Sequence, residues 1–290
     1  FQFGLVAASD THVAASSDDE STYFSKAGIL DGEPLGRGSV PVSLLYGAVV
    51  RMLAPENLVE VEGRNYMTGG GFETWSASGI AGVWAEENTR ESIYDAFRRK
   101  ETFATTGPRI KVRFFAGTDF ADDIIGSGKL AALAYEQGVP MGGELFTGGR
   151  TPSFLVWASA DPRGTPLQRL QVIKGYLRDG EPAERVFDVA CSGGSLPDPV
   201  THRCADNGAR VDLSDCSISQ GVGDAELLTR WEDPDYNANV DAFYYVRVLE
   251  NPSCRWSTWD AIRAGVAPRP DLPETIQERA WSSPIWVRNG

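Results

Sequence analysis

Short apolar runs separated by polar loops mark the first hundred residues. Residues 3–8 form an almost wholly apolar run, and residues 79–84 form a second one. Runs of this length without alternation are typical of strands buried on both faces of a parallel sheet. A longer apolar stretch over residues 42–53, with Pro55 just past its end, predicts a helix between the two strands.

A second helix is predicted directly after the second apolar run, over residues 89–100. Asn88 is its expected N-cap, and Glu91 stands at the capping-box spacing. Side chains that recur at helical spacing should form its buried face. They are Ile93, Tyr94 and Phe97. Strand, loop and helix in this order indicate a parallel α/β sheet or (β/α) barrel.

Beyond Pro108 the pattern changes to short β-type runs separated by Gly, Pro and Asp. The predicted strands are residues 110–115, 154–159, 170–174, 185–190 and 243–249. We therefore expect a chain of the α/β plus all-β class with a boundary near Gly107–Pro108. Residues 1–107 would form an α/β domain, and residues 108–290 a β-rich, sandwich-like domain packed on it.

Charge and length exclude several classes of protein. The 290 residues carry a formal net charge of −13, which argues against nucleic-acid binding, because phosphate contacts require a clustered Lys/Arg face. The longest apolar stretch, residues 40–53, is interrupted by polar residues and too short to cross a bilayer. Residues 1–6 lack the basic and apolar regions of a signal peptide, so we expect any export signal upstream of them.

The four cysteines all lie in a loop-rich region of the C-terminal half. They are Cys191, Cys204, Cys216 and Cys254. An even number in such a region indicates two disulfides and an oxidising compartment, with the connectivity open. The alternative is four unpaired thiols in a cytosolic protein.

Polar side chains follow both predicted strands of the first domain. Asp10 and His12 come after the first strand, and Glu86, Glu87 and Asn88 after the second. Because the carboxyl ends of parallel strands meet at one edge, both groups should open onto the same face. A carboxylate and an imidazole two residues apart can bind one metal ion or two adjacent ones. Taken alone, the first pair also fits a turn-capping Asp beside an exposed His, and acidic residues at a helix start are favoured by its dipole.

Two ordered segments resemble the polymerase and histidinol phosphatase (PHP) superfamily, which has a distorted (β/α) barrel. Residues 5–12 resemble its C-terminal metal motif, and residues 89–110 its closing helix and turn. A closer resemblance is to a bacterial PHP-like family catalogued as domain of unknown function 3604. The resembling segments are residues 82–90, 139–143, 242–250, 255–258 and 276–286.

The resemblance implies that residues 1–107 are the C-terminal part of a PHP-type barrel. It also implies a site with two or three divalent metal ions (Mn, Zn or Fe), to which Asp10 supplies a carboxylate oxygen and His12 an imidazole nitrogen. The early His-x-His pair of such enzymes is absent, because His12 and His202 are the only histidines. We therefore expect the remaining ligands in upstream sequence of the same protein or in a separate chain.

Other side chains are candidates for substrate contacts. Trp84, Glu86, Glu87 and Asn88 would flank the metal face, although Trp84 fits a packing role at least as well. Arg109 and Arg279 are further candidates, and each could instead have a purely structural role. The candidates are Trp84, Glu86, Glu87, Asn88, Arg109 and Arg279.

The function expected from this resemblance is a metal-dependent hydrolase of a phosphate ester or similar small ester, periplasmic or secreted from a bacterium. Glycosidic, sulfate or carbamate bonds are alternative targets. A hypothesis of another class is a non-catalytic β-rich module that binds a carbohydrate or other ligand on a barrel remnant. The aromatic-rich C-terminal half motivates it.

Overall fold

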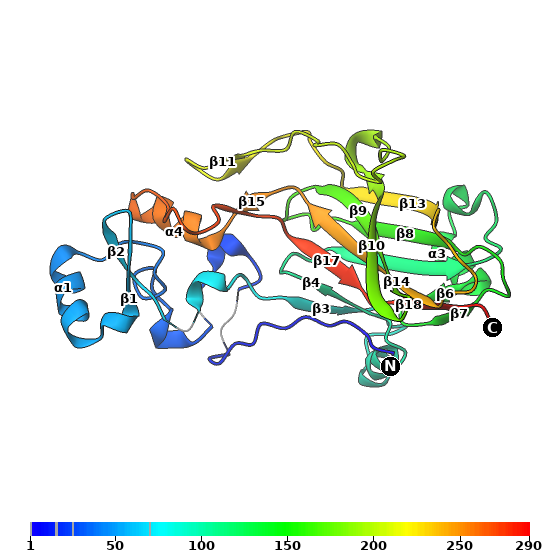
Figure 1. Ribbon diagram of the computed structural model, residues 1–290, viewed down its shortest axis with the longest axis horizontal. Helices are drawn as coiled ribbons and strands as arrows, with labels where there is room; N and C mark the ends of the chain where they lie inside the picture. The colour runs from blue at the N-terminus through cyan, green and yellow to red at the C-terminus, as the bar shows by residue number, and fades with distance from the viewer. Residues whose placement is uncertain (1, 15–16, 25, 70) are drawn as a thin grey trace.

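Two mostly antiparallel sheets packed face to face form the larger part of the molecule (Figure 1). The computed structural model describes residues 2–14, 17–24, 26–69 and 71–290. The eight-stranded sheet has the order β10 (Glu181–Cys191), β9 (Leu167–Arg178), β14 (Ala242–Glu250), β17 (Arg279–Ser282), β4 (Thr102–Thr105) and β3 (Ile80–Val83), while β18 (Ile285–Arg288) pairs with β14 and β7 (Glu144–Phe146). The four-stranded sheet has the order β13 (Glu226–Glu232), β8 (Ser153–Ser159), β5 (Lys111–Gly117) and β6 (Val139–Pro140).

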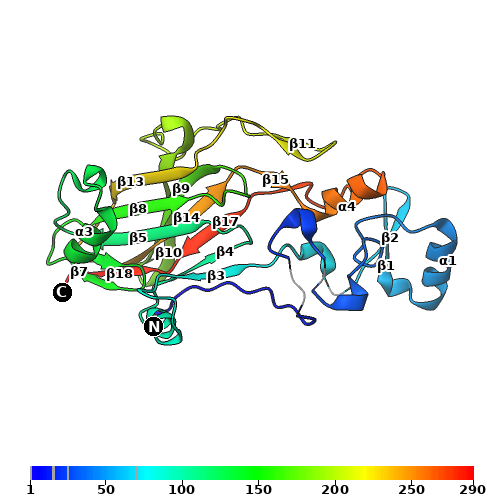
Figure 2. The ribbon, with the colours of Figure 1, turned by 180° about the vertical axis from the view of Figure 1, so that it is seen from behind.

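The core lies between these two sheets, and side-chain alternation explains how it forms. On β5, Phe114 points towards the larger sheet and stacks on Phe154 of β8, with ring centroids 5.6 Å apart. Phe154 in turn lies 4.6 Å from the ring of Tyr244 on β14. On the other face of β5, Phe115 packs with Ile124 in a second cluster. Figure 2 shows the helix α3 (Leu130–Gln137) beside this outer face.

A smaller lobe lies beyond one end of the sandwich (Figure 1). It is built mainly from residues between 17 and 78, joined by the helix α4 (Trp256–Ala264) from the C-terminal part. Its other regular elements are α1 (Leu44–Leu53), the hairpin β1 (Leu58–Val61) and β2 (Arg64–Met67), and the short 3-10 turns η1 (Glu20–Thr22), η2 (Gly28–Leu30), η3 (Pro55–Asn57) and η4 (Phe72–Thr74).

The remaining elements connect the two parts or decorate the sandwich. They are α2 (Arg90–Arg98), the turns η5 (Ile124–Gly126) and η6 (Ser192–Gly194), and the short strand pairs β11 (Val211–Asp212) with β12 (Ser217–Ile218) and β15 (Ser253–Cys254) with β16 (Thr275–Ile276).

The β-rich class predicted for the C-terminal part is confirmed. The five strands predicted there correspond to β5, β8, β9, β10 and β14. The apolar run over residues 79–84 forms the strand β3, as expected, but β3 pairs antiparallel with β4, so the predicted parallel sheet was wrong. The helix predicted over residues 42–53 is α1, whose first residue is Leu44 because the hydroxyl of Ser43 accepts the N–H of Tyr46.

The second predicted helix exists as α2, but its details differ from the prediction. Its N-cap is Thr89 rather than Asn88, since the Thr89 hydroxyl accepts the N–H of Ser92. The buried residue of the helix is Ala96, whereas Tyr94 and Phe97 are 59% and 41% exposed. The expected buried face was therefore wrong for those two aromatic residues.

The strand predicted over residues 3–8 was also wrong, because this segment joins no sheet. It lies along the edge of the sandwich, where the N–H of Leu5 donates to the hydroxyl of Ser283 instead of to a neighbouring backbone carbonyl. Ala7 lies next to Gly79, the residue before β3, whereas Leu5 lies near the other end of that strand. The segment therefore runs antiparallel to β3. Apolar side chains on this run cover the sheet without extending its ladder.

The described residues form a mixed α/β structure with several sheets and no closed barrel. Strands β3 and β4 precede the boundary expected near Gly107, yet they belong to the same sheet as β14 and β17. One sheet therefore contains strands from both sides of the predicted domain boundary.

Candidate functional site

Asp10 and His12 lie in an exposed loop that is attached to Lys26. The Lys26 ammonium is 3.0 Å from Oδ2 of Asp10, and the carbonyl oxygen of Lys26 accepts the N–H of His12 at 2.9 Å. Lys26 is itself held over the ring of Trp75, with its nitrogen 4.7 Å from the ring centroid. The backbone of the loop is therefore fixed while the Asp10 and His12 side chains face solvent.

Asp10 has an ionised carboxylate, and its backbone has an uncommon conformation. The hydrogen bond and charge of Lys26 lower the pKa of Asp10, and His12 contributes in the same direction. The φ angle of Asp10 is 52°, in the left-handed region where Asp is one of the tolerated residues. Such conformations cluster at functional sites, although turns also use them.

The donor types of this loop suit a divalent metal, but the set is incomplete. A carboxylate oxygen and an imidazole nitrogen are ordinary ligands of Zn, Mn and Fe. Within residues 2–14, 17–24, 26–69 and 71–290, no group of three or more His, Cys, Asp or Glu side chains is arranged to hold a metal ion. Asp10 and His12 can therefore supply only part of a coordination shell.

The second predicted group lies at the other end of β3. Glu86, Glu87 and Asn88 are exposed and follow the last residue of this strand, whereas Asp10 and His12 lie beyond its first residue. The expectation that both groups open onto one face was wrong. Its cause is the direction of residues 3–8, which run antiparallel to β3 rather than parallel to it.

Trp84 has a packing role in the sandwich. Its indole N–H donates to the carbonyl of Val112 at 2.8 Å, and the guanidinium of Arg113 lies 3.6 Å from its ring centroid. The ring also contacts Phe103, with centroids 5.9 Å apart. These contacts hold Trp84 away from the loop of Asp10.

Arg109 and Arg279 lie beside a cavity that the sequence did not reveal. The N–H of Arg109 donates to the carboxylate of Asp161 at 2.7 Å, and its guanidinium is 3.7 Å from Asp18. The N–H of Arg279 donates to the hydroxyl of Thr106 at 2.9 Å. Asp161 and Asp18 both line the cavity, as does Glu278, the neighbour of Arg279.

This cavity, here called the acidic cavity, has a volume of about 420 Å³ and lies where the sandwich meets the smaller lobe. Its lining contains six carboxylates and one arginine. The lining residues are Asp18, Asp19, Glu20, Ser21, Thr22, Gly107, Pro108, Asp161, Arg163, Gly164, Thr165, Cys216, Ile218, Glu250, Ser253, Cys254, Trp259 and Glu278. An excess of one charge in a recess attracts ligands of the opposite charge.

Glu250 and Glu278 are two buried carboxyl groups that line the cavity. They stand opposite one another at the ends of β14 and β17, where the N–H of Glu250 donates to the carbonyl of Glu278 at 3.0 Å. Burial raises the pKa of Glu250 to about 8 and that of Glu278 to about 7, and each group is raised further by neighbouring carboxylates. At pH 7 Glu250 is therefore mostly protonated, whereas Glu278 is protonated in about half of the molecules.

The other buried carboxylates are satisfied by backbone donors. Glu20 accepts the N–H of Ala77 at 2.6 Å and that of Trp256 at 2.7 Å, which connects η1 to α4. Burial nevertheless raises its pKa. At Asp161 burial acts in the same direction, but the N–H groups of Arg109 and Arg163 outweigh it and lower the pKa.

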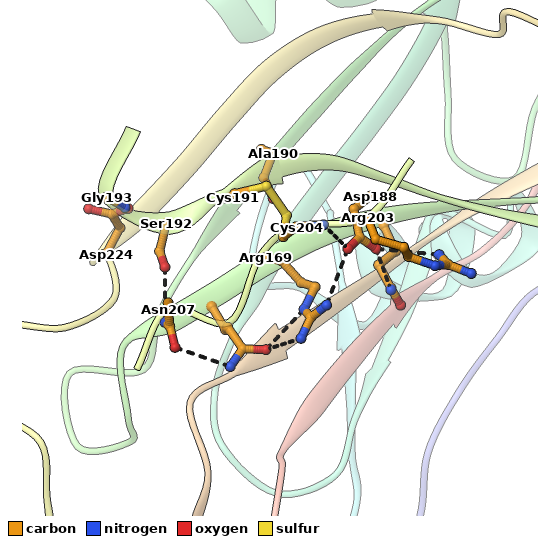
Figure 3. The surroundings of a disulfide bond; sticks show 12 residues. Arg169, Asp188, Ala190, Cys191, Ser192, Gly193, Arg203, Cys204, Asn207 and Asp224 are labelled. Carbon is orange, nitrogen blue, oxygen red and sulfur yellow. Dashed lines mark hydrogen bonds and ion pairs between the residues drawn. A yellow bond between two sulfur atoms is a disulfide. The ribbon is translucent and has the colours of Figure 1, made fainter. Parts of the chain in front are cut away.

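The two disulfides are present, and their pairing is now known. Cys191 joins Cys204, and Cys216 joins Cys254. Figure 3 shows the first of them, next to the buried carboxylate of Asp188, which accepts the N–H of Cys204 at 2.7 Å. The second disulfide lines the acidic cavity.

The described residues contain no helix long and apolar enough to span a membrane. No curated protein and no solved structure matches the chain. A family model does match, over residues 1–289, and its description is "Protein of unknown function (DUF3604)". Because the match covers nearly the whole sequence, the chain belongs to the DUF3604 family.

Proposed function

We propose that this protein is a metal-dependent hydrolase of a phosphate ester or another small ester, with Asp10 and His12 among the metal ligands. The observation that carries the proposal is the loop itself. A deprotonated carboxylate and an exposed imidazole lie on a backbone that Lys26 holds from both its side chain and its carbonyl. A divalent metal bound there would lower the pKa of a water molecule and polarise an ester oxygen.

The residues of this loop have defined tasks in the proposal. Asp10 and His12 bind and orient the metal, so neither acts as a general base. The ammonium of Lys26 lies on Oδ2 of Asp10, so it would compete with a metal ion for this oxygen. We propose that the remaining metal ligands are supplied by upstream sequence of the same protein or by a separate chain.

The proposed location is the periplasm or the extracellular space. The two disulfides support it, because such bonds form and persist in oxidising compartments. The substrate is proposed as an ester, and sulfate, glycosidic and carbamate bonds are the other targets to be tested.

The test compares Asp10→Ala, His12→Ala and the natural full-length protein. Metal content after loading with Mn, Zn or Fe is measured by elemental analysis, and hydrolysis with a panel of chromogenic phosphate, carboxylate, sulfate, glycoside and carbamate substrates. We expect both variants to lose bound metal and hydrolysis together. His202→Gln is the matched control, because this other histidine packs on Phe187 in the sandwich, 5.2 Å between ring centroids. Unchanged metal content and activity in both variants would overturn the proposal.

A further inference from the structure

We infer that the acidic cavity is a binding site for a small organic cation that carries alkylammonium groups. This inference does not rest on the proposed hydrolase, because none of the residues that carry it is an expected metal ligand. The cavity holds six carboxylates against the single guanidinium of Arg163, which is exposed.

A buried oxygen of Glu250 lacks a hydrogen-bond partner. Glu250 is 1% exposed, and its Oε2 accepts the N–H of Thr165 at 3.2 Å. The Thr165 hydroxyl also lies 3.2 Å from Oε2, but it has a closer acceptor in the carbonyl of Asn251 at 2.7 Å. Its Oε1 has no partner among the described residues. A buried polar atom without a partner costs free energy, so it marks a position where a donor from a ligand would stabilise the protein.

The register of the sheet adds a second observation. Leu249 on β14 is paired with Arg279 on β17, so Glu250 and Glu278 are directly opposite one another. Two carboxylates at such a position would repel each other and destabilise an antiparallel pair, which disfavours the ionised form of both. A sequence that keeps two carboxyl groups there departs from the rules of sheet stability, as functional sites do.

The size and lining of the cavity define the class of ligand. A volume of about 420 Å³ lies at the lower end of the range for small-molecule sites, about 300–1,000 Å³. An ammonium group offers three N–H donors and no acceptor, which suits a wall of carboxylates. Pro108, Ile218 and Trp259 provide apolar surface for the methylene chain of such a ligand.

The groups that face Glu250 determine what happens to its proton. Burial is the main cause of the raised pKa of Glu250; the hydrogen bonds from Thr165 lower it, and Glu278 and Asp161 raise it further. The positive charge of a bound ammonium would offset the effect of these two carboxylates, lower the pKa of Glu250 and favour its ionised form. Binding near neutral pH is therefore accompanied by proton release.

The experiment is a calorimetric titration of the full chain with putrescine, with 1,4-butanediol as the uncharged control ligand. Repeating it in buffers of different ionisation enthalpy counts the protons released. We expect one diamine per chain, no binding of the diol, and release of protons at neutral pH. Glu250→Gln should weaken binding about ten-fold or more, since a hydrogen bond to a charged group is lost, and should reduce proton release.

Two further variants make the result decisive. Glu278→Gln tests the same cavity from the opposite strand and should also weaken binding, which covers the case in which Glu250→Gln fails to fold. Glu136→Gln removes one exposed carboxylate from α3 and should leave binding unchanged. No binding of putrescine at about 10 mM, equal affinity in the folded Glu250→Gln variant, or an equal loss in Glu136→Gln would overturn the inference. Displacement of the diamine by Ca²⁺ or Mn²⁺ bound more tightly at the same carboxylates would also overturn it, in favour of a metal site.

Discussion

The guanidinium of Arg37 and the carboxylate of Asp260 form a buried, two-pronged ion pair, although 223 residues separate them. Nε donates to Oδ2 at 2.8 Å and Nη2 to Oδ1 at 2.6 Å, and the Ser39 hydroxyl adds a third bond at 2.6 Å. Arg37 also lies over the stacked rings of Tyr23 and Trp256. This contact joins the N-terminal part of the smaller lobe to α4.

Removing one partner of this pair should destabilise the smaller lobe strongly. Arg37→Ala leaves the Asp260 carboxylate buried without its main donor, which costs about 3–5 kcal/mol. Urea unfolding monitored by tryptophan fluorescence measures the loss, because Trp256, which contacts Arg37, is one of the eight tryptophans that contribute to the signal. Arg51→Ala is the control, since it breaks an exposed pair with Glu60 at 3.3 Å and an exposed hydrogen bond to Asn65, and it should cost about 1 kcal/mol or less. Equal losses in the two variants would contradict the prediction.

The sequence predicted the strands of the sandwich because their signal is local. In strands such as β5, core-facing residues like Phe114 alternate with residues on the other face. This alternation is visible in the sequence wherever one face of a strand is buried, so it predicts the strand without knowledge of its partners. Residues 3–8 carry the composition of a strand but not its pairing. Their position depends on distant groups such as Ser283, which the local pattern does not contain.

The acidic cavity was not predictable from the sequence for a related reason. Glu250 and Glu278 are 28 positions apart and meet only through the register of β14 with β17. The available signal was the acidic residue that ends the mostly apolar run over residues 242–250, and it points equally well to an ordinary strand end. Asp10 and His12 were recognised through a family resemblance, which carries information that spacing alone does not.

The apolar surface of α1 should contribute little to stability. Leu45 is 78% exposed, whereas Val50 on the same helix is 9% exposed. Leu45→Ser should therefore change the free energy of unfolding by about 0.5 kcal/mol or less, and Val50→Ala should cost about 2 kcal/mol. Urea unfolding of the two variants measures both values. A larger loss in Leu45→Ser than in Val50→Ala would show that the exposed side is covered in solution.

The two disulfides should differ in their effect on the acidic cavity. They close segments of 13 and 38 residues, so chain entropy predicts losses of about 3 kcal/mol for Cys191→Ser/Cys204→Ser and about 4 kcal/mol for Cys216→Ser/Cys254→Ser. The second bond lines the acidic cavity, so its removal should also weaken putrescine binding. Thermal unfolding and calorimetric titration of each double variant test the two effects. Loss of binding only in the variant without Cys191–Cys204 would contradict the assignment of the site.

Glu250 should make the protein less stable as the pH rises through the neutral range. Its pKa is about 8 in the folded protein and near the ordinary value of 4.5 in the unfolded chain. Between these two values the folded state binds more protons than the unfolded state, so the free energy of unfolding decreases with pH. The contribution is fully present below about pH 4.5, and its loss is complete above about pH 8. The slope from this one group is at most about 1.4 kcal/mol per pH unit.

Glu250→Gln removes this titration while keeping the shape of the side chain. The difference in unfolding free energy between the variant and the wild type should therefore shift in favour of the variant from pH 5 to pH 8, as measured by urea unfolding across that range. Glu136→Gln is again the control, because its exposed carboxylate is not held in a buried acidic pair. A difference that stays constant with pH would mean that Glu250 is ionised in the folded protein, and the proton release predicted for diamine binding would then have no source at this residue.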